Sequence, residues 1–134
     1  ADRYFGFDDA VYASCRLLEI LSRAGGPMSA LLEGVPKLFA TPEIRIDCPD
    51  DLKFRVVDAV RSIYAGRYET ITIDGVRITM PDGWALVRAS NTQPVIVLRF
   101  EAASEQRLEA IRQEITATVK REMEAASETA QATA

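Results

Sequence analysis

The chain has no histidine, few cysteines, a single tryptophan and no long apolar run, and each shortage narrows what it can be. Without histidine it lacks the commonest metal ligand and the commonest general base near neutral pH. No apolar run approaches the roughly 20 residues that cross a bilayer, and the first residues carry no basic-then-apolar signal pattern. We therefore expect no membrane partner and a cytoplasmic location.

The two cysteines, Cys15 and Cys48, lie far apart in apolar contexts, which favours buried free thiols in a reducing compartment over a disulfide. The formal net charge is −4. This negative charge argues against a protein whose surface binds nucleic acid, although it allows a local anion pocket. With 134 residues, 48% hydrophobic and 27% charged, the chain is long enough for about one soluble globular domain.

The first part of the chain is helical in pattern. Asp8 or Asp9 can cap an amphipathic helix that Gly25-Gly26 ends, and a short second helix follows. Repeated glycine and proline then break regular structure. Residues 1–33 are therefore expected to form a helical segment, and residues 34–42 a linker or hinge.

From residue 43 onward the pattern indicates strand, helix, hairpin, strand, strand and helix. Asp74-Gly75 between two alternating runs predicts a hairpin with a type I′ turn. Ser104 can cap the last long helix, whereas residues 124–134 show no apolar stripe and predict a flexible tail. Residues 43–123 thus form an α+β domain, an antiparallel four- to five-stranded sheet with two helices on one face.

The only concentrated chemistry lies in the loop from Arg88 to Pro94. It gathers a guanidinium, two hydroxyls and two carboxamides, which suit holding an oxyanion such as phosphate. None of these groups is a good general base near neutral pH. On composition alone, a plain polar connection between two strands is the commoner explanation, and Arg88 at the strand end keeps the anion site open.

Three other features have structural explanations that we prefer. Asp8 and Asp9 resemble paired catalytic acids, but acids at a helix start are stabilised by the helix dipole. Trp84 could stack on a sugar, yet a lone tryptophan opening a strand usually packs in a core. Arg99 is either a second anion donor or a surface partner of an acid such as Glu101.

The stretch from Gly83 to Glu101, which contains Arg88-Ala89-Ser90-Asn91-Thr92-Gln93-Pro94, closely resembles the C-terminal domain of the bacterial α-D-phosphohexomutases. The phosphomannomutase/phosphoglucomutase branch matches best, because the phosphoglucosamine mutase branch typically has Ser-Gly-Thr-Glu-Pro in this loop. The segments Tyr4 to Asp9 and Thr41 to Glu43 resemble the end of that family's third domain and its connection to the fourth. The resemblance spans roughly residues 3 to 120.

This resemblance implies a fourth domain similar to the TATA-box-binding-protein-like fold. The parent enzymes interconvert hexose 1-phosphate and hexose 6-phosphate, of glucose or mannose. The fourth domain holds the phosphate that is not being transferred. The implied phosphate contacts are Arg88, Ser90, Asn91 and Thr92.

The family's phosphoserine, magnesium and sugar-specificity loops all lie upstream of the matched part. The implied partners are therefore a phosphosugar and the missing N-terminal domains, and Mg²⁺ belongs to the full-length enzyme. We expect no cofactor, no metal site and no catalytic residue in this chain, which should be inactive alone. The alternative is an independent interaction or nucleic-acid-binding module with a similar sheet-and-helix fold.

Overall fold

The computed structural model describes residues 4–133, and the chain falls into two compact units, Ala1–Pro36 and Lys37–Ala134. The boundary between these units lies inside the segment 34–42 that the sequence predicts as a linker. Strand β1, Phe39–Ala40, also lies in this segment and pairs with the sheet of the second unit. The second unit therefore begins before residue 43.

The first unit is built around helix α1, Ala10–Ala24. Asp9 is its N-cap, because the Asp9 carboxylate accepts a hydrogen bond from the backbone N–H of Tyr12 at 2.9 Å. Gly25 ends the helix with a left-handed φ of +67°. The prediction of a helix with these ends is confirmed, and a short 3₁₀ helix, η1 (Met28–Leu32), follows it.

No residue of α1 is buried. Cys15 is a free but exposed thiol, so the expectation of two buried thiols is wrong for it and right for Cys48. The physical reason is that no other element of the first unit covers the apolar side of α1. An amphipathic pattern predicts which side of a helix is apolar, but it does not show that another element packs against that side.

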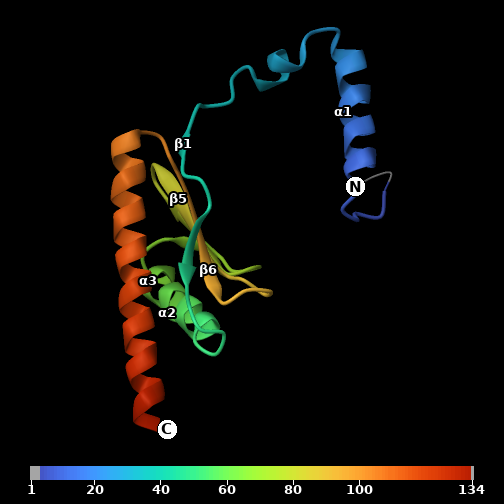
Figure 1. Ribbon diagram of the computed structural model, residues 1–134. Coiled ribbons are helices and arrows are strands. Elements are labelled where there is room, and N and C mark those ends of the chain that lie inside the picture. Colours follow the sequence, from blue (N-terminus) through green and yellow to red (C-terminus); the bar gives the residue numbers. More distant parts are fainter. Residues whose placement is uncertain (1–3, 134) are drawn as a thin grey trace. The chain divides into compact units, whose positions relative to one another are not determined.

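The second unit is a six-stranded antiparallel sheet with two helices (Figure 1). Hydrogen-bonded neighbours run in the order β1-β6-β5-β4-β3, and β2 also pairs with β6. The α+β class and the antiparallel sheet with helices are thereby confirmed. The elements after β1 are β2 (Ile44–Asp47), α2 (Lys53–Ala65), β3 (Glu69–Ile71), β4 (Val76–Met80), β5 (Gly83–Ala89), β6 (Val95–Ala102) and α3 (Glu105–Thr133).

The sixth strand arises because β1 and β2 share one edge of β6. Ala40 pairs with Glu101, whereas Ile44 pairs with Leu98 further along the same strand. Pro42 interrupts this edge, since proline has no N–H to give to a ladder. The sheet therefore has six strands in five positions, one more strand than the sequence pattern indicated.

Two local expectations are corrected. The connection from β3 to β4 has four residues, 72–75, and only Gly75 has positive φ, so it is not the type I′ turn that Asp-Gly suggested. Helix α3 continues to Thr133 instead of ending near Glu124. Ala126 and Ala130 pack against the core from this extension, because small residues cover apolar surface without forming a visible apolar stripe.

The core lies between one face of the sheet and helices α2 and α3. Alternate residues of β4, β5 and β6 point into it, and Ile78, Val87 and Phe100 are fully buried there. Trp84 points to the opposite face and is only half-buried, so its predicted core position is wrong. Its indole N–H donates to Glu101 at 3.1 Å, and among the described residues Arg99 is exposed and forms no ion pair with Glu101.

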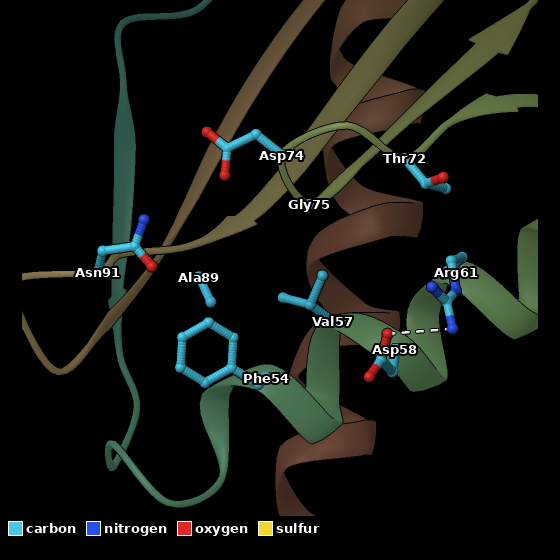
Figure 2. Close-up of a pocket in the computed structure, with 9 residues that line it drawn as sticks. All are labelled: Phe54, Val57, Asp58, Arg61, Thr72, Asp74, Gly75, Ala89 and Asn91. Carbon is cyan, nitrogen blue, oxygen red and sulfur yellow. Dashed lines mark ion pairs between the residues drawn. The ribbon is translucent and has the colours of Figure 1, made fainter.

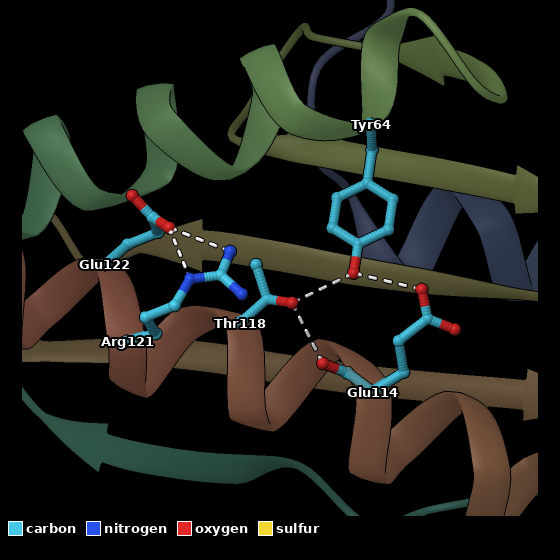
Figure 3. A network of polar contacts seen from close by, with 5 residues as sticks. All are labelled: Tyr64, Glu114, Thr118, Arg121 and Glu122. Atoms are coloured by element: carbon cyan, nitrogen blue, oxygen red, sulfur yellow. Dashed lines mark hydrogen bonds and ion pairs between the residues drawn. The ribbon is translucent and has the colours of Figure 1, made fainter.

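A buried polar network joins the two helices (Figure 3). The Tyr64 hydroxyl of α2 lies 3.0 Å from the Thr118 hydroxyl and 3.2 Å from a carboxylate oxygen of Glu114, both on α3. Burial raises the pKa of Tyr64, so the phenol keeps the proton that it donates to Glu114. The network fixes α2 beside α3 and lies apart from the loop with the candidate chemistry.

Candidate anion-binding site

The candidate loop, residues 90–94, joins the neighbouring antiparallel strands β5 and β6. Its base is closed by two backbone hydrogen bonds, from Ser90 N–H to the Val95 carbonyl at 3.0 Å and from Val95 N–H to the Gln93 carbonyl at 2.8 Å. The ladder continues below it with Ala89 opposite Ile96. The loop is therefore a tight connection with a defined backbone path.

The side chains inside the loop differ in what they can offer a ligand. The Ser90 hydroxyl oxygen accepts from the backbone N–H groups of Thr92 and Gln93, at 3.4 and 3.2 Å, which stabilises the turn. The hydroxyl proton of Ser90 stays available to donate. Asn91 and Thr92 are exposed, so their side chains are free to meet a ligand.

Arg88 precedes the loop on the face of the sheet that the helices leave open. One terminal nitrogen, Nη1, lies 3.1 Å from Oδ2 of Asp74, and the two side chains are 41% and 58% exposed. The Nε of Arg88 is buried and has no hydrogen-bond partner. The guanidinium thus has one acidic partner and one unsatisfied donor.

The position of Asp74 is set by Gly75 beside it. Gly75 has φ of +81°, and a Cβ atom there would lie 2.4 Å from the Val87 carbonyl oxygen and 2.8 Å from the Arg88 Cα. Only glycine fits this close approach without displacing the backbone. The turn 72–75 is therefore pressed against β5 next to Arg88, which brings Asp74 to the guanidinium.

The far side of the loop is fastened to β2 and the start of α2. The Lys53 ammonium donates to the Gln93 carbonyl at 3.1 Å, the Arg45 guanidinium donates to the Gln93 side chain at 2.7 Å, and the Cys48 N–H donates to the Pro94 carbonyl at 2.8 Å. Sequence reasoning missed Lys53 and Asp74. Both contact the loop region across long stretches of chain. The Asp74-Gly75 pattern indicated a turn but not its closeness to Arg88, and no local pattern marks Lys53.

Cys48, whose N–H makes one of these bonds, is buried, with 1% of the residue exposed. Burial raises the pKa of the Cys48 thiol, and the nearby charge of Asp51 raises it further. A thiol with a raised pKa stays protonated near neutral pH, and the thiolate is the reactive form.

A small cleft lies beside the loop, with a volume of about 170 Å³ (Figure 2). This volume is smaller than that of the pockets of about 300–1,000 Å³ that enclose drug-sized ligands, so the cleft suits a small chemical group. Of the predicted contact residues only Asn91 reaches it, whereas Arg88, Ser90 and Thr92 do not line it. The lining residues are Phe54, Val57, Asp58, Arg61, Thr72, Asp74, Gly75, Ala89 and Asn91.

No metal site appears within residues 4–133, where no group of three or more His, Cys, Asp or Glu side chains is arranged to hold an ion. Over the same residues, none of the helices is both long and apolar enough to cross a membrane. The loop's donors are a guanidinium, hydroxyls, a carboxamide and backbone N–H groups, which suit an oxyanion and not a cation.

Comparison with known proteins gives consistent matches. Residues 43–118 match the family described as phosphoglucomutase/phosphomannomutase, C-terminal domain. A phosphomannomutase/phosphoglucomutase of Pseudomonas aeruginosa is 47% identical over 112 residues, covering 83% of this chain and 24% of that protein. A phosphoglucomutase of Neisseria meningitidis serogroup B is 44% identical over 122 residues, covering 89% of this chain and 26% of that protein.

A solved structure agrees with these matches. The crystal structure of a phosphoglucomutase/phosphomannomutase family protein from Burkholderia thailandensis superposes with a TM-score of 0.65 at 43% identity, covering 94% of this chain and 26% of that one. The chain thus spans about a quarter of the length of the relatives it matches. It belongs to the phosphoglucomutase/phosphomannomutase family and contains that family's C-terminal domain.

Proposed function

We propose that this chain is the phosphate-holding, closing part of a phosphohexomutase that interconverts the 1- and 6-phosphates of glucose or mannose. The observation that carries the proposal is the 90–94 loop, a turn with a fixed backbone that exposes Asn91 and Thr92 and follows Arg88 near the end of β5. The names of the relatives support the reaction class. Because the chain spans only a quarter of their length, the activity of the whole enzyme is part of the proposal.

In this role Arg88, Ser90, Asn91 and Thr92 contact the phosphate that is not being transferred. The charged guanidinium supplies the strongest interaction, and the hydroxyl, carboxamide and backbone N–H groups direct the remaining oxygens. Binding energy gained at this distant phosphate orients the sugar for in-line transfer at its other end. The loop moves no proton and makes no covalent bond, so the bond-making residues belong to the rest of the enzyme.

The parent enzymes also imply Mg²⁺, which would act on the phosphoryl group in transfer. The donor set of the 90–94 loop does not fit a cation, so the proposal places the ion's ligands in the upstream part. A phosphosugar and the upstream domains are the proposed partners, and the cytoplasm is the proposed location. The purified chain should show no mutase activity.

The test is an NMR titration of the ¹⁵N-labelled chain with inorganic phosphate and with glucose 6-phosphate. Backbone amide signals of residues 88–93 and of Val95 should shift. The affinity should be weak, because the isolated loop supplies only part of a closed site. Arg88→Ala should abolish these shifts. Arg121→Ala, which removes the same charge from an exposed position on α3, should leave them intact.

Two results would refute the role of the loop. One is a set of ligand-induced shifts that avoids residues 88–95. The other is an Arg88→Ala titration that matches the unaltered chain.

A further inference from the structure

Lys53 is a buried cation that the proposed phosphate contacts do not include. It is the first residue of α2, and the residue is only 4% exposed. The buried polar or charged residues within the described part of the chain are Lys53 and Thr118. Lysine is almost never this buried unless its ammonium is paired, so its contacts decide what it does.

Those contacts lead to the candidate loop. The Nζ of Lys53 donates to the Gln93 carbonyl at 3.1 Å, and it also donates to the Asp50 carboxylate one turn earlier. The Phe54 ring centroid lies 5.3 Å from the same ammonium. Gln93 is 40 residues away in sequence, so Lys53 joins the start of α2 to the loop.

The Gln93 carbonyl takes part in the hydrogen bonds that shape the turn. It also accepts from the N–H of Val95, while the N–H of Gln93 donates to the Ser90 hydroxyl. Fixing this carbonyl fixes the Gln93–Pro94 peptide at the closing end of the loop, and with it the backbone path that presents Ser90, Asn91 and Thr92. The ammonium therefore supports the closing end of the loop, next in sequence to the proposed contact residues.

The charge of Lys53 has a second consequence. Its counter-ion, Asp50, has a side chain that is 72% exposed, whereas the Lys53 side chain is 5% exposed. Water screens the acid more than it screens the buried ammonium, so positive potential remains on the inner side of the loop. A neutral side chain at position 53 would avoid the free-energy cost of desolvating a charge. The chain nevertheless has a lysine there, hydrogen-bonded to the proposed anion-binding loop.

We propose that Lys53 is a positioning residue for phosphate binding, which holds the Gln93 peptide in place and adds fixed positive charge behind the loop. The inference rests on the proposed function, since it assigns a supporting residue to the same site. Lys53 does not touch the phosphate. It acts through the Gln93 carbonyl, which holds the closing end of the loop, and through the electrostatic field of its charge.

The experiment titrates the full 134-residue chain and its Lys53→Met variant with inorganic phosphate at several salt concentrations. Lys53→Met should weaken phosphate binding by about five- to twenty-fold, because a unit positive charge near the anion is lost at the effective dielectric constant of about 20 that applies near a protein surface. It should also flatten the dependence of affinity on salt, which a purely structural role would not change. Lys120→Met, at an exposed lysine on α3, should change neither quantity.

Asp50→Asn provides a second variant at an exposed site, in case Lys53→Met does not fold. Removing the acid leaves the ammonium less neutralised, so phosphate should bind about two-fold more tightly. Unchanged or weaker binding in Asp50→Asn would overturn the inference, as would unchanged affinity and salt dependence in folded Lys53→Met.

The outcome also separates this inference from the proposed function. If Arg88→Ala abolishes binding and both Lys53 and Asp50 variants bind as the unaltered chain does, only the role of Lys53 fails. If the unaltered chain shows no shifts at residues 88–95, both fail together.

Discussion

The two units of this protein contain amphipathic helices that differ in how deeply their apolar residues are buried. Helix α1 of the first unit has a clear apolar stripe, yet none of its residues is buried, and Val11 and Leu18 are 75% and 64% exposed. Helices α2 and α3 of the second unit place comparable stripes against a sheet, where Val60 and Ile115 are fully buried. An amphipathic pattern therefore identifies a helix, but only tertiary packing turns it into stability.

The largest expected effect compares one core position from the second unit with one exposed position from the first. Phe100→Ala removes a fully buried ring from β6 and should lower the free energy of unfolding by about 3–5 kcal/mol. Leu18→Ala on α1 should change the unfolding of the second unit by less than about 0.5 kcal/mol. Urea unfolding followed by Trp84 fluorescence reports on the second unit, and equal losses in both variants would break the comparison.

Two glycines with positive φ, one in each unit, allow a second comparison of packed and unpacked positions. Gly75→Ala should cost about 1–3 kcal/mol, because the new Cβ meets the Val87 carbonyl oxygen and the Arg88 Cα. Gly25 has a similar backbone angle but nothing within 4 Å of a Cβ, so Gly25→Ala should affect only the end of α1. Thermal unfolding measures both, and a stable Gly75→Ala variant would show that the turn 72–75 is not pressed against β5 in solution.

A smaller effect concerns charge at the candidate site. Asp74→Asn removes the acidic partner of Arg88, so phosphate no longer competes with a carboxylate, and affinity should rise about two- to five-fold. Asp8→Asn makes the same charge change in the first unit and should leave affinity unchanged. Phosphate titration by NMR gives both values. Weaker binding in Asp74→Asn would mean that Asp74 orients Arg88 for the ligand instead of competing with it.

A pH effect should appear within the first unit. The backbone N–H of Tyr12 and then the Tyr4 hydroxyl lower the pKa of Asp9, so the cap on α1 is intact above the ordinary pKa of aspartate. It should be lost as pH falls through the lowered folded-state value. The Tyr12 amide shift should follow this titration. Asp9→Asn should remove the titration while keeping a cap, and a pH-independent Tyr12 amide in the unaltered chain would contradict the assignment.

The smallest expected effect is that of deleting residues 1–36. The core of the second unit is made entirely from its own residues, so the remaining chain should unfold within about 2 °C of the intact one. Differential scanning calorimetry measures this midpoint. A large drop would show that the first unit contributes to the stability of the second.

Much of this organisation was predictable from local sequence. Asp9 and Gly25 marked the ends of α1, Ser104 marked the start of α3, and alternation of apolar residues predicted the strands. The end of α3 was not predictable, because alanine gives no apolar signal until a core is known to lie beside it. The exposure of Trp84 was also missed, since a single strand does not say which of its faces the helices will cover.

The sequence by itself determined most of the helices and strands, the position of the polar loop and its likeness to the phosphohexomutases. These depend on residues that are near one another in the chain. Tertiary structure alone decided that β1 and β2 share an edge of β6, that Asp74 meets Arg88, and that Lys53 is buried behind Gln93. The physical reason is that each of these contacts joins segments far apart in sequence, and packing of the sheet against its helices selects which distant groups meet.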